Sequence, residues 1–151
     1  MLVEELEKSL NSQELNSIYV LYGEEKFLLE SVVKKIKKKF GECINGINYI
    51  NIDETNINEL ISDIQTPAFG YPKKLIIVKN SEILKKEGKR KNPELAKIKT
   101  NLAEYIEENI DIINESTIIV FVEENVEKQK LYKTLEKHGI VCEFAFQKPM
   151  Q

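Results

Sequence analysis

Three continuous apolar runs constrain the fold of this chain more than any other feature of its 151 residues. They cover residues 18–22, 75–78 and 118–122, consist mainly of β-branched and aromatic residues, and are too short for buried helices. A short apolar run without alternation is typical of a strand that is covered on both faces, as in a parallel sheet. The three runs therefore predict the central strands of a sheet that lies between two layers of helices.

Apolar residues at helical spacing separate these runs and predict helices over 2–15, 28–40, 57–64, 98–113 and 126–138. Two further segments, 47–52 and 140–146, alternate apolar and polar residues as edge strands do. Regular alternation of strands and helices implies parallel strands joined by right-handed crossovers. We therefore expect an α/β fold with a five-stranded parallel, doubly wound sheet, formed by residues 1–151 as a single domain.

Composition and charge exclude several classes of protein. Hydrophobic residues make up 42% and charged residues 31% of the chain, as in ordinary globular domains, and the net charge of −3 gives no bulk attraction to nucleic acid. No apolar run approaches the roughly 18 residues that a membrane span requires, and the N-terminus lacks the pattern of a secretory signal. Cys43 and Cys142 have no metal-site or disulfide-framework spacing. We expect a cytoplasmic protein without a membrane partner.

The loop after the first central strand determines whether such a fold can bind a nucleotide. It contains Gly23, Glu24, Glu25 and Lys26, whereas a phosphate-binding loop needs several glycines and a Gly-Lys-Ser/Thr ending. Two carboxylates at the start of the following helix satisfy the helix dipole themselves and repel a phosphate. The sequence therefore predicts a degenerate nucleotide loop and no cofactor.

The loops after the other two central strands offer little for catalysis. Lys79 and Asn80 follow the second, where a nucleotide hydrolase needs an acidic residue for Mg²⁺. Glu123 and Glu124 follow the third; such a pair can bind Mg²⁺ or transfer protons, but carboxylates at a strand exit usually face water, and we expect that here. The single histidine, His138, precedes a glycine and is expected to cap the end of a helix. We expect no catalytic residue and no metal site.

A response-regulator receiver is the alternative that this pattern leaves open, beside a phosphate-handling domain of P-loop type. Glu24 and Glu25 lie where receivers have an acidic pair, and Lys148-Pro149 resembles their lysine-proline step. The aspartate that receivers phosphorylate is replaced by Lys79-Asn80. The edge strands do not distinguish the two topologies, because both have the second and fifth strands outside.

The segment 66–72 has the sequence TPAFGYP and precedes the second central strand, so it lies at the opposite edge of the sheet from the usual ligand site. Its prolines bracket Phe69 and Tyr71. Phe69 either packs onto the core of its own domain or serves as an interface anchor that loses little conformational entropy on docking. Residues 85–91 are strongly basic and form either a solvated loop or a contact with DNA.

Several segments together carry a resemblance to a known family. They are YVLYGEE at 19–25 followed by Phe27-Leu28, the stretch from Leu60 through Phe69-Gly70 into KKLIIV at 73–78, residues 118–121, and KLYK at 130–133 ahead of Gly139. In their order and spacing, the chain resembles the N-terminal domain of the delta subunit of the bacterial DNA polymerase III clamp loader. The resemblance implies an AAA+-like fold, related to P-loop NTPases, without a working nucleotide site.

The same resemblance implies a function without catalysis. Delta subunits bind the sliding clamp, the beta subunit of the polymerase, and promote its opening for loading on primed DNA during replication. Their hydrophobic contact pair, typically Leu-Phe, corresponds to Ala68 and Phe69, between Pro67 and Tyr71. The resemblance also implies contacts with other loader subunits through later lid and collar domains, indirect contact with DNA, and a nucleoid-associated location. It favours an exposed, functional Phe69.

Overall fold

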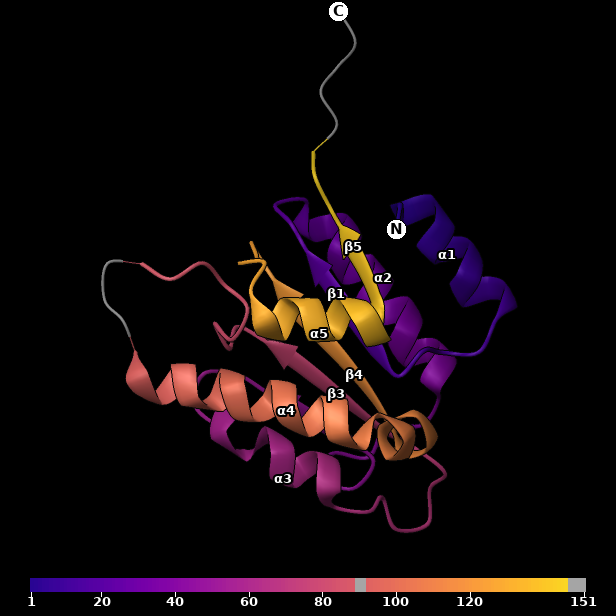
Figure 1. Cartoon of the computed structure of the whole chain (residues 1–151). Coiled ribbons are helices and arrows are strands. Elements are labelled where there is room, and N and C mark those ends of the chain that lie inside the picture. The colour runs from indigo at the N-terminus through magenta and orange to yellow at the C-terminus, as the bar shows by residue number, and fades with distance from the viewer. Residues whose placement is uncertain (89–91, 147–151) are drawn as a thin grey trace, which may run out of the picture.

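A parallel five-stranded sheet forms the centre of the computed structural model, which describes residues 1–88 and 92–146 (Figure 1). The strand order is β2-β3-β4-β1-β5, and every pairing is parallel. The strands are β1 (Ile18–Tyr22), β2 (Tyr49–Ile52), β3 (Lys74–Lys79), β4 (Thr117–Glu123) and β5 (Ile140–Glu143). The predicted α/β fold with a five-stranded parallel sheet is confirmed.

The three continuous apolar runs form the three inner strands, as predicted. β4 is buried along its whole length, and it pairs with β3 on one side and with β1 on the other. β2 and β5 lie at the two edges, and each keeps residues that are half-buried or exposed. Strands that are covered on both faces need apolar side chains at every position, and edge strands do not.

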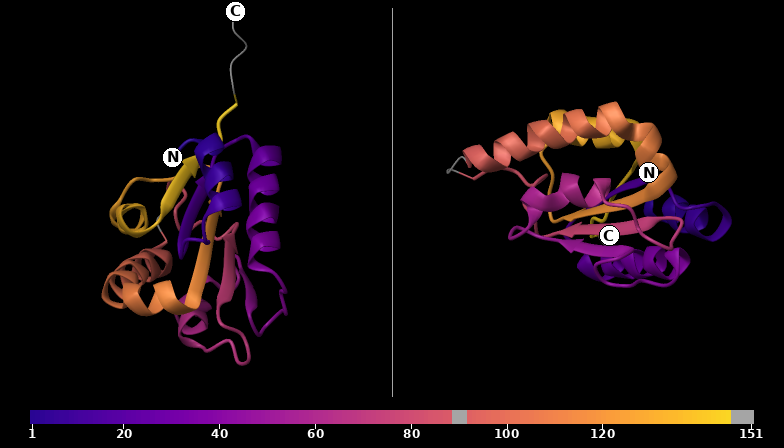
Figure 2. Two further views of the ribbon diagram at one scale, coloured as in Figure 1. Left: turned by 90° about the vertical axis from the view of Figure 1, so that its right-hand side faces the viewer. Right: turned by 90° about the horizontal axis from the view of Figure 1, so that it is seen from below.

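Helices cover both faces of the sheet (Figure 2). α1 (Val3–Ser12) and α2 (Lys26–Phe40) pack on one face, where Leu6, Val32 and Ile36 are buried. The other face carries the short helices η1 (Ile57–Glu59) and α3 (Leu60–Gln65) together with α4 (Pro93–Ser116) and α5 (Lys130–His138). Within the described residues, no helix has both the length and the apolar character needed to cross a bilayer.

Some predicted boundaries differ from the observed ones. The edge strands are shorter than expected, α5 begins at Lys130 rather than near Val126, and α4 runs on to Ser116. Asn92 caps α4 by accepting a hydrogen bond from the Leu95 N–H (3.1 Å). At Asn109 the backbone of α4 leaves helical geometry, and the side-chain amide donates to the Tyr105 carbonyl oxygen (2.9 Å). Such a side-chain hydrogen bond competes with the helical backbone pattern and bends the helix.

The strand order excludes the receiver topology. In a receiver-type sheet the first strand lies between the second and the third. Here β1 lies between β4 and β5, and β3 lies between β2 and β4. The receiver alternative is therefore wrong, although its edge strands would have been the same. Lys148-Pro149, the step that resembled receivers, lies outside the described residues.

Candidate functional site

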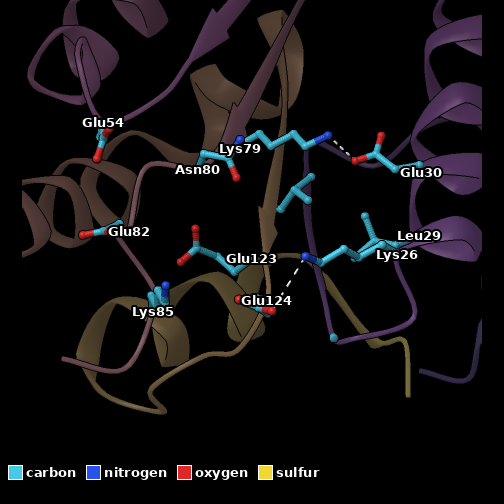
Figure 3. A pocket seen from close by; sticks show the side chains of 12 residues that line it. Lys26, Leu29, Glu30, Glu54, Lys79, Asn80, Glu82, Lys85, Glu123 and Glu124 are labelled. Atoms are coloured by element: carbon cyan, nitrogen blue, oxygen red, sulfur yellow. Dashed lines mark hydrogen bonds and ion pairs between the residues drawn. The ribbon is translucent and has the colours of Figure 1, made fainter. Parts of the chain in front are cut away.

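Two regions at opposite edges of the sheet contain the residues that the sequence singled out. The first, which we call the carboxyl-edge cleft, is a depression of about 460 Å³ at the carboxyl ends of β1, β3 and β4 (Figure 3). Its lining includes Gly23, Lys26, Glu30, Glu54, Lys79, Asn80, Glu82, Lys85, Glu123 and Glu124. The second, the amino-edge loop, consists of residues 66–72 between α3 and β3, at the lower right in Figure 1.

Backbone N–H groups of the degenerate nucleotide loop already have acceptors within the chain. Gly23 donates to the Glu123 carbonyl oxygen (3.1 Å), Glu25 to the Phe144 carbonyl oxygen (3.0 Å) and Lys26 to the Glu24 carbonyl oxygen (3.0 Å). Phosphate cradles depend on free N–H groups at the start of a helix. The loop thus uses for its own folding the groups that a phosphate-binding loop leaves available.

Gly23 is required for this arrangement. Its φ is +140°, and a Cβ atom there would lie 2.1 Å from the Phe144 carbonyl oxygen. The glycine therefore permits close contact between the loop and the chain that leaves β5. A glycine that serves phosphate binding would instead face the ligand.

The acidic side chains of this loop lie at the start of α2, as the sequence predicts. α2 begins at Lys26 with Glu25 at the N-cap position, but the Glu25 carboxylate accepts no capping hydrogen bond. Glu24 is exposed, and Lys26 forms an exposed ion pair with Glu124 (3.8 Å). The two carboxylates can therefore act on the helix dipole through their charge, without a capping hydrogen bond.

Glu123 is buried, which corrects the prediction that both glutamates at this strand exit face water. Its exposed fraction is 7%, and its Oε2 has no hydrogen-bond partner. Burial raises the pKa of Glu123 to about 7, against the lowering effects of the Leu84 backbone and the Lys85 charge. Glu124 is exposed as predicted.

The burial of Glu123 comes from the chain that follows β3. Ile83 and Leu84 are buried, and the Leu84 carbonyl oxygen accepts from the Glu127 N–H (2.8 Å). The Lys86 N–H donates to the Asn125 side chain (3.0 Å). This segment thus packs along the residues that follow β4 and covers the strand exit.

The structure also shows the surroundings of His138 and of the two cysteines. His138 Nε2 lies 2.8 Å from a carboxylate oxygen of Glu107 on α4, so it links two helices rather than capping its own. Cys142 is fully buried in β5, as expected of a small core residue, and Cys43 is partly exposed. In residues 1–88 and 92–146, no three His, Cys, Asp or Glu side chains are arranged to hold a metal ion.

Phe69 projects from the amino-edge loop with 76% of its surface exposed. The Tyr71 N–H donates to the Ala68 carbonyl oxygen (2.9 Å), which closes a four-residue turn with Phe69 at its second position. Gly70, at the third position, has φ +85°, a conformation that turns of this kind reserve for glycine. Of the two possibilities that the residues left open, the ring is exposed rather than packed on its own core.

A buried lysine fixes the start of this loop. Lys74 is 2% exposed, and its ammonium donates to the carbonyl oxygens of Asp63, Ile64 (3.1 Å) and Thr66. Carbonyl groups at a helix end lack intrahelical partners, so one side chain satisfies the end of α3 and the first residue of the loop. Burial lowers the pKa of Lys74, and the Asp63 charge opposes this effect. Lys74 was not among the predicted site residues; the feature that could have indicated it is a lysine at the first position of a buried strand.

The other predicted residues of the loop lie around Phe69. Pro67 is exposed, Ala68 is half-buried, and Tyr71 is half-buried. Tyr71 lines a groove of about 460 Å³ together with Leu15, Phe40, Pro72 and Ile118. The loop therefore combines one exposed ring with a partly apolar groove beside it.

The basic segment is only partly described. Lys85 lines the carboxyl-edge cleft and Lys86 is exposed, whereas residues 89–91 lie outside the described part of the chain. Its contact with DNA stays a prediction.

Comparison with known proteins decides which family has these features. The sequence profile of the family described as "DNA polymerase III, delta subunit" matches residues 19–145. The chain belongs to this family. The DNA polymerase III subunit delta of Bacillus subtilis (strain 168) is 30% identical over 142 residues, which are 90% of this chain and 39% of that protein.

Solved structures agree with this assignment. The B. subtilis DNA clamp loader delta protein (YqeN) has a TM-score of 0.72 and 26% identity, covering 95% of this chain and 42% of that one. A DNA polymerase III gamma subunit-related protein from Thermotoga maritima has a TM-score of 0.51 at 15% identity, over 97% and 46%, and shows the fold alone. An AAA+-like fold is consistent with these similarities. The chain spans about two fifths of the length of its delta relatives.

Proposed function

We propose that this chain is the clamp-binding part of a clamp-loader delta subunit, and that Phe69 is its principal contact with the sliding clamp. The observation that carries the proposal is the 76% exposure of this ring at the tip of a turn. Large apolar side chains at the tip of a rigid loop lose little conformational entropy when they dock. Ala68 and Tyr71 extend the contact on either side, and Pro67 limits the conformations of the loop.

The size of the expected contact agrees with this role. Burying the exposed part of a phenylalanine side chain removes on the order of 150 Å² from water, or roughly 4 kcal/mol at ~25 cal/mol/Å². Such a residue is a typical interface hot spot. Ring opening follows only if the loop binds the open or distorted clamp more tightly than the closed one, because a ligand shifts an equilibrium by its differential affinity alone. We propose that Phe69 supplies this differential contact.

The proposal includes no catalysis by this chain. The hydrogen bonds within the loop 23–26 support it, since three N–H groups in that loop already donate to carbonyl oxygens of the chain. We further propose that the subunit assembles with the other loader subunits through lid and collar domains beyond this chain. Its contact with DNA is then indirect, within a nucleoid-associated complex. A calorimetric titration with ATP and Mg²⁺ tests the absence of nucleotide chemistry, and stoichiometric uptake would contradict it.

The deciding experiment measures the affinity of this chain for the sliding clamp of the same organism by surface plasmon resonance. We expect Phe69→Ala to weaken binding by about 2 kcal/mol or more, which is roughly thirtyfold. Phe27→Ala is the matched control, because Phe27 is 85% exposed but lies at the start of α2. The fold of each variant is checked by circular dichroism.

The two variants together separate a specific contact from general loss of apolar surface. If Phe69→Ala bound the clamp as tightly as the unmodified chain, the assigned contact would be wrong. If both variants lost affinity equally, binding would depend on exposed aromatic surface in general rather than on the amino-edge loop.

A further inference from the structure

The carboxyl-edge cleft contains a buried carboxylate, that of Glu123, with one oxygen that has no hydrogen-bond partner. The Glu123 side chain is 7% exposed, and its Oε2 accepts no hydrogen bond. Figure 3 shows the carboxylate directed from the end of β4 toward the wall that carries Asn80 and Glu82. Buried charges in folded proteins are normally paired, because an unpaired one loses its hydration without compensation. The geometry therefore indicates a missing partner for Glu123.

The charge balance of the cleft identifies the sign of that partner. Five glutamates and three lysines line it. Lys79 pairs with Glu30, and Lys26 pairs with Glu124 (3.8 Å). These pairs leave the carboxylates of Glu54, Glu82 and Glu123 with a single lysine, Lys85. Its charge lowers the pKa of Glu123, although no ion pair joins the two side chains in the described part of the chain. The cleft thus has an excess of negative charge where related folds hold a phosphate.

The size of the cleft and the spacing of its acceptors favour a cation larger than a bare metal ion. Its volume is about 460 Å³, and in the described residues no group of three acidic or histidine side chains could coordinate a metal. Acceptors stand on separate walls: Glu123 at the end of β4, Glu82 and the Asn80 side chain beyond β3. Asn80 and Glu82 both have positive φ, at 57° and 64°. Asparagine tolerates this left-handed conformation, whereas glutamate adopts it rarely.

A guanidinium group fits these acceptors better than an ammonium group does. Its five N–H donors lie in one plane and point in different directions, so it can contact acceptors on two walls at once. It is also less strongly hydrated than an ammonium group and is therefore favoured at buried ion pairs. We propose that the carboxyl-edge cleft binds the guanidinium group of an arginine side chain of a partner protein, with Glu123 as its main counter-charge.

A titration of the isotope-labelled chain at pH 8, followed by amide NMR shifts, tests this proposal. The probe is N-acetyl-L-arginine amide, and the matched neutral probe is N-acetyl-L-citrulline amide, which has nearly the same shape without the charge. We expect the arginine probe to shift the amides of Leu84, Lys85 and Glu123 saturably, with a dissociation constant on the order of millimolar for so small a ligand. The citrulline probe should cause no saturable shift at these positions.

Variants of the chain show whether the named carboxylates are responsible. Glu123→Gln keeps the size of the side chain, and we expect it to weaken arginine binding at least fivefold. Glu82→Gln, an exposed position on the cleft wall, should weaken binding to a smaller extent and guards against a folding defect in the first variant. Glu115→Gln on α4 changes the net charge equally and should leave affinity unchanged.

Several outcomes would overturn the proposal. Equal shifts with the citrulline probe, or arginine affinity that is unaffected by Glu123→Gln, would show that no charge-specific site exists in the cleft. Saturation of the same amides by spermidine or MgCl₂ at lower concentration than by the arginine probe would assign the cleft to a free cation instead of a protein side chain. None of these results bears on clamp binding, because Phe69 belongs to the amino-edge loop between α3 and β3, at the other edge of the sheet.

Discussion

The two edges of the sheet differ in how their loops use polar and apolar groups. At the carboxyl edge, backbone N–H groups of the loop donate to carbonyl oxygens within the chain, Gly23 packs against Phe144, and Glu123 is buried. At the amino edge, a closed turn exposes Phe69 to solvent. Parallel α/β sheets usually bind ligands at the carboxyl edge. Here internal contacts hold the loops around a polar cleft at the edge that the fold normally uses, and the opposite edge offers the larger apolar contact.

This difference predicts that changes in the packed loop at the carboxyl edge alter stability, whereas changes in the exposed amino-edge loop mainly alter affinity for the clamp. Substitution of Gly23 gives the largest expected effect. Gly23→Ala places a Cβ atom 2.1 Å from backbone atoms of Phe144 at φ +140°, so we expect the free energy of unfolding to fall by about 3 kcal/mol or more. Chemical denaturation measures this change.

Gly70→Ala is the matched substitution in the amino-edge loop. Its φ is also positive, at +85°, but the space around it is open. Only conformational strain then applies, and we expect a loss of about 1 kcal/mol of stability. Comparable losses at the two glycines would contradict the distinction between a packed edge and an open one.

Glu123 gives the next largest effect, and it depends on pH. Its pKa is raised to about 7 from the ordinary value of 4.5, so between these values the folded chain binds more protons than the unfolded chain. Stability therefore falls as pH rises through this window. We expect Glu123→Gln to raise the free energy of unfolding by about 2 kcal/mol at pH 8 and to leave it almost unchanged at pH 4.5, since each pKa unit is worth about 1.4 kcal/mol. Urea denaturation at both pH values measures the difference.

The adjacent Glu124 provides the control for this effect. It is exposed, and its one ion pair, with Lys26, is long and solvated. Glu124→Gln should therefore show no pH-dependent gain. A gain of equal size in both variants would mean that the general negative charge of the cleft, rather than the burial of Glu123, is responsible.

The inner strands could be predicted from the sequence because a strand covered on both faces must be apolar at every position. The ends of the edge strands could not. The regular strand β5 ends at Glu143. The next residue, Phe144, nevertheless donates to the Tyr22 carbonyl oxygen (2.7 Å) and accepts from the Glu25 N–H. These contacts join residues that are more than 100 positions apart in the chain, and no local pattern encodes them.

The environments of the site residues could not be predicted from the sequence for the same reason, because they also depend on contacts between separate segments. The burial of Glu123 depends on Ile83 and Leu84, which belong to a polar and basic segment, 80–92, whose sequence is typical of a long loop or a frayed helix. The prolines and the glycine of the amino-edge loop fit both an exposed and a packed Phe69. Lys74 fixes the start of this loop by donating to a carbonyl oxygen at the end of α3. The spacing of residues in the sequence does not reveal this contact.

Substitution of Ala68 has the smallest expected effect, and it tests directly whether the amino-edge loop contacts the clamp. The family resemblance implies a larger aliphatic residue at this position, and Ala68 is only half-buried in this chain. Ala68→Leu adds apolar surface beside Phe69, and we expect it to strengthen clamp binding by about 1 kcal/mol, or roughly fivefold, because only part of the added surface becomes buried. Ala68→Ser adds no apolar surface and serves as the control in the same surface plasmon resonance assay.

Combining Ala68→Leu with Phe69→Ala determines whether the two positions form one contact. Residues that fill the same pocket couple, so the gain from leucine should shrink when the ring is absent. Full retention of the gain would mean that position 68 contacts the clamp independently of Phe69. In that case the amino edge would bind through a broad apolar surface, and the contrast with the carboxyl edge would no longer depend on a single exposed ring.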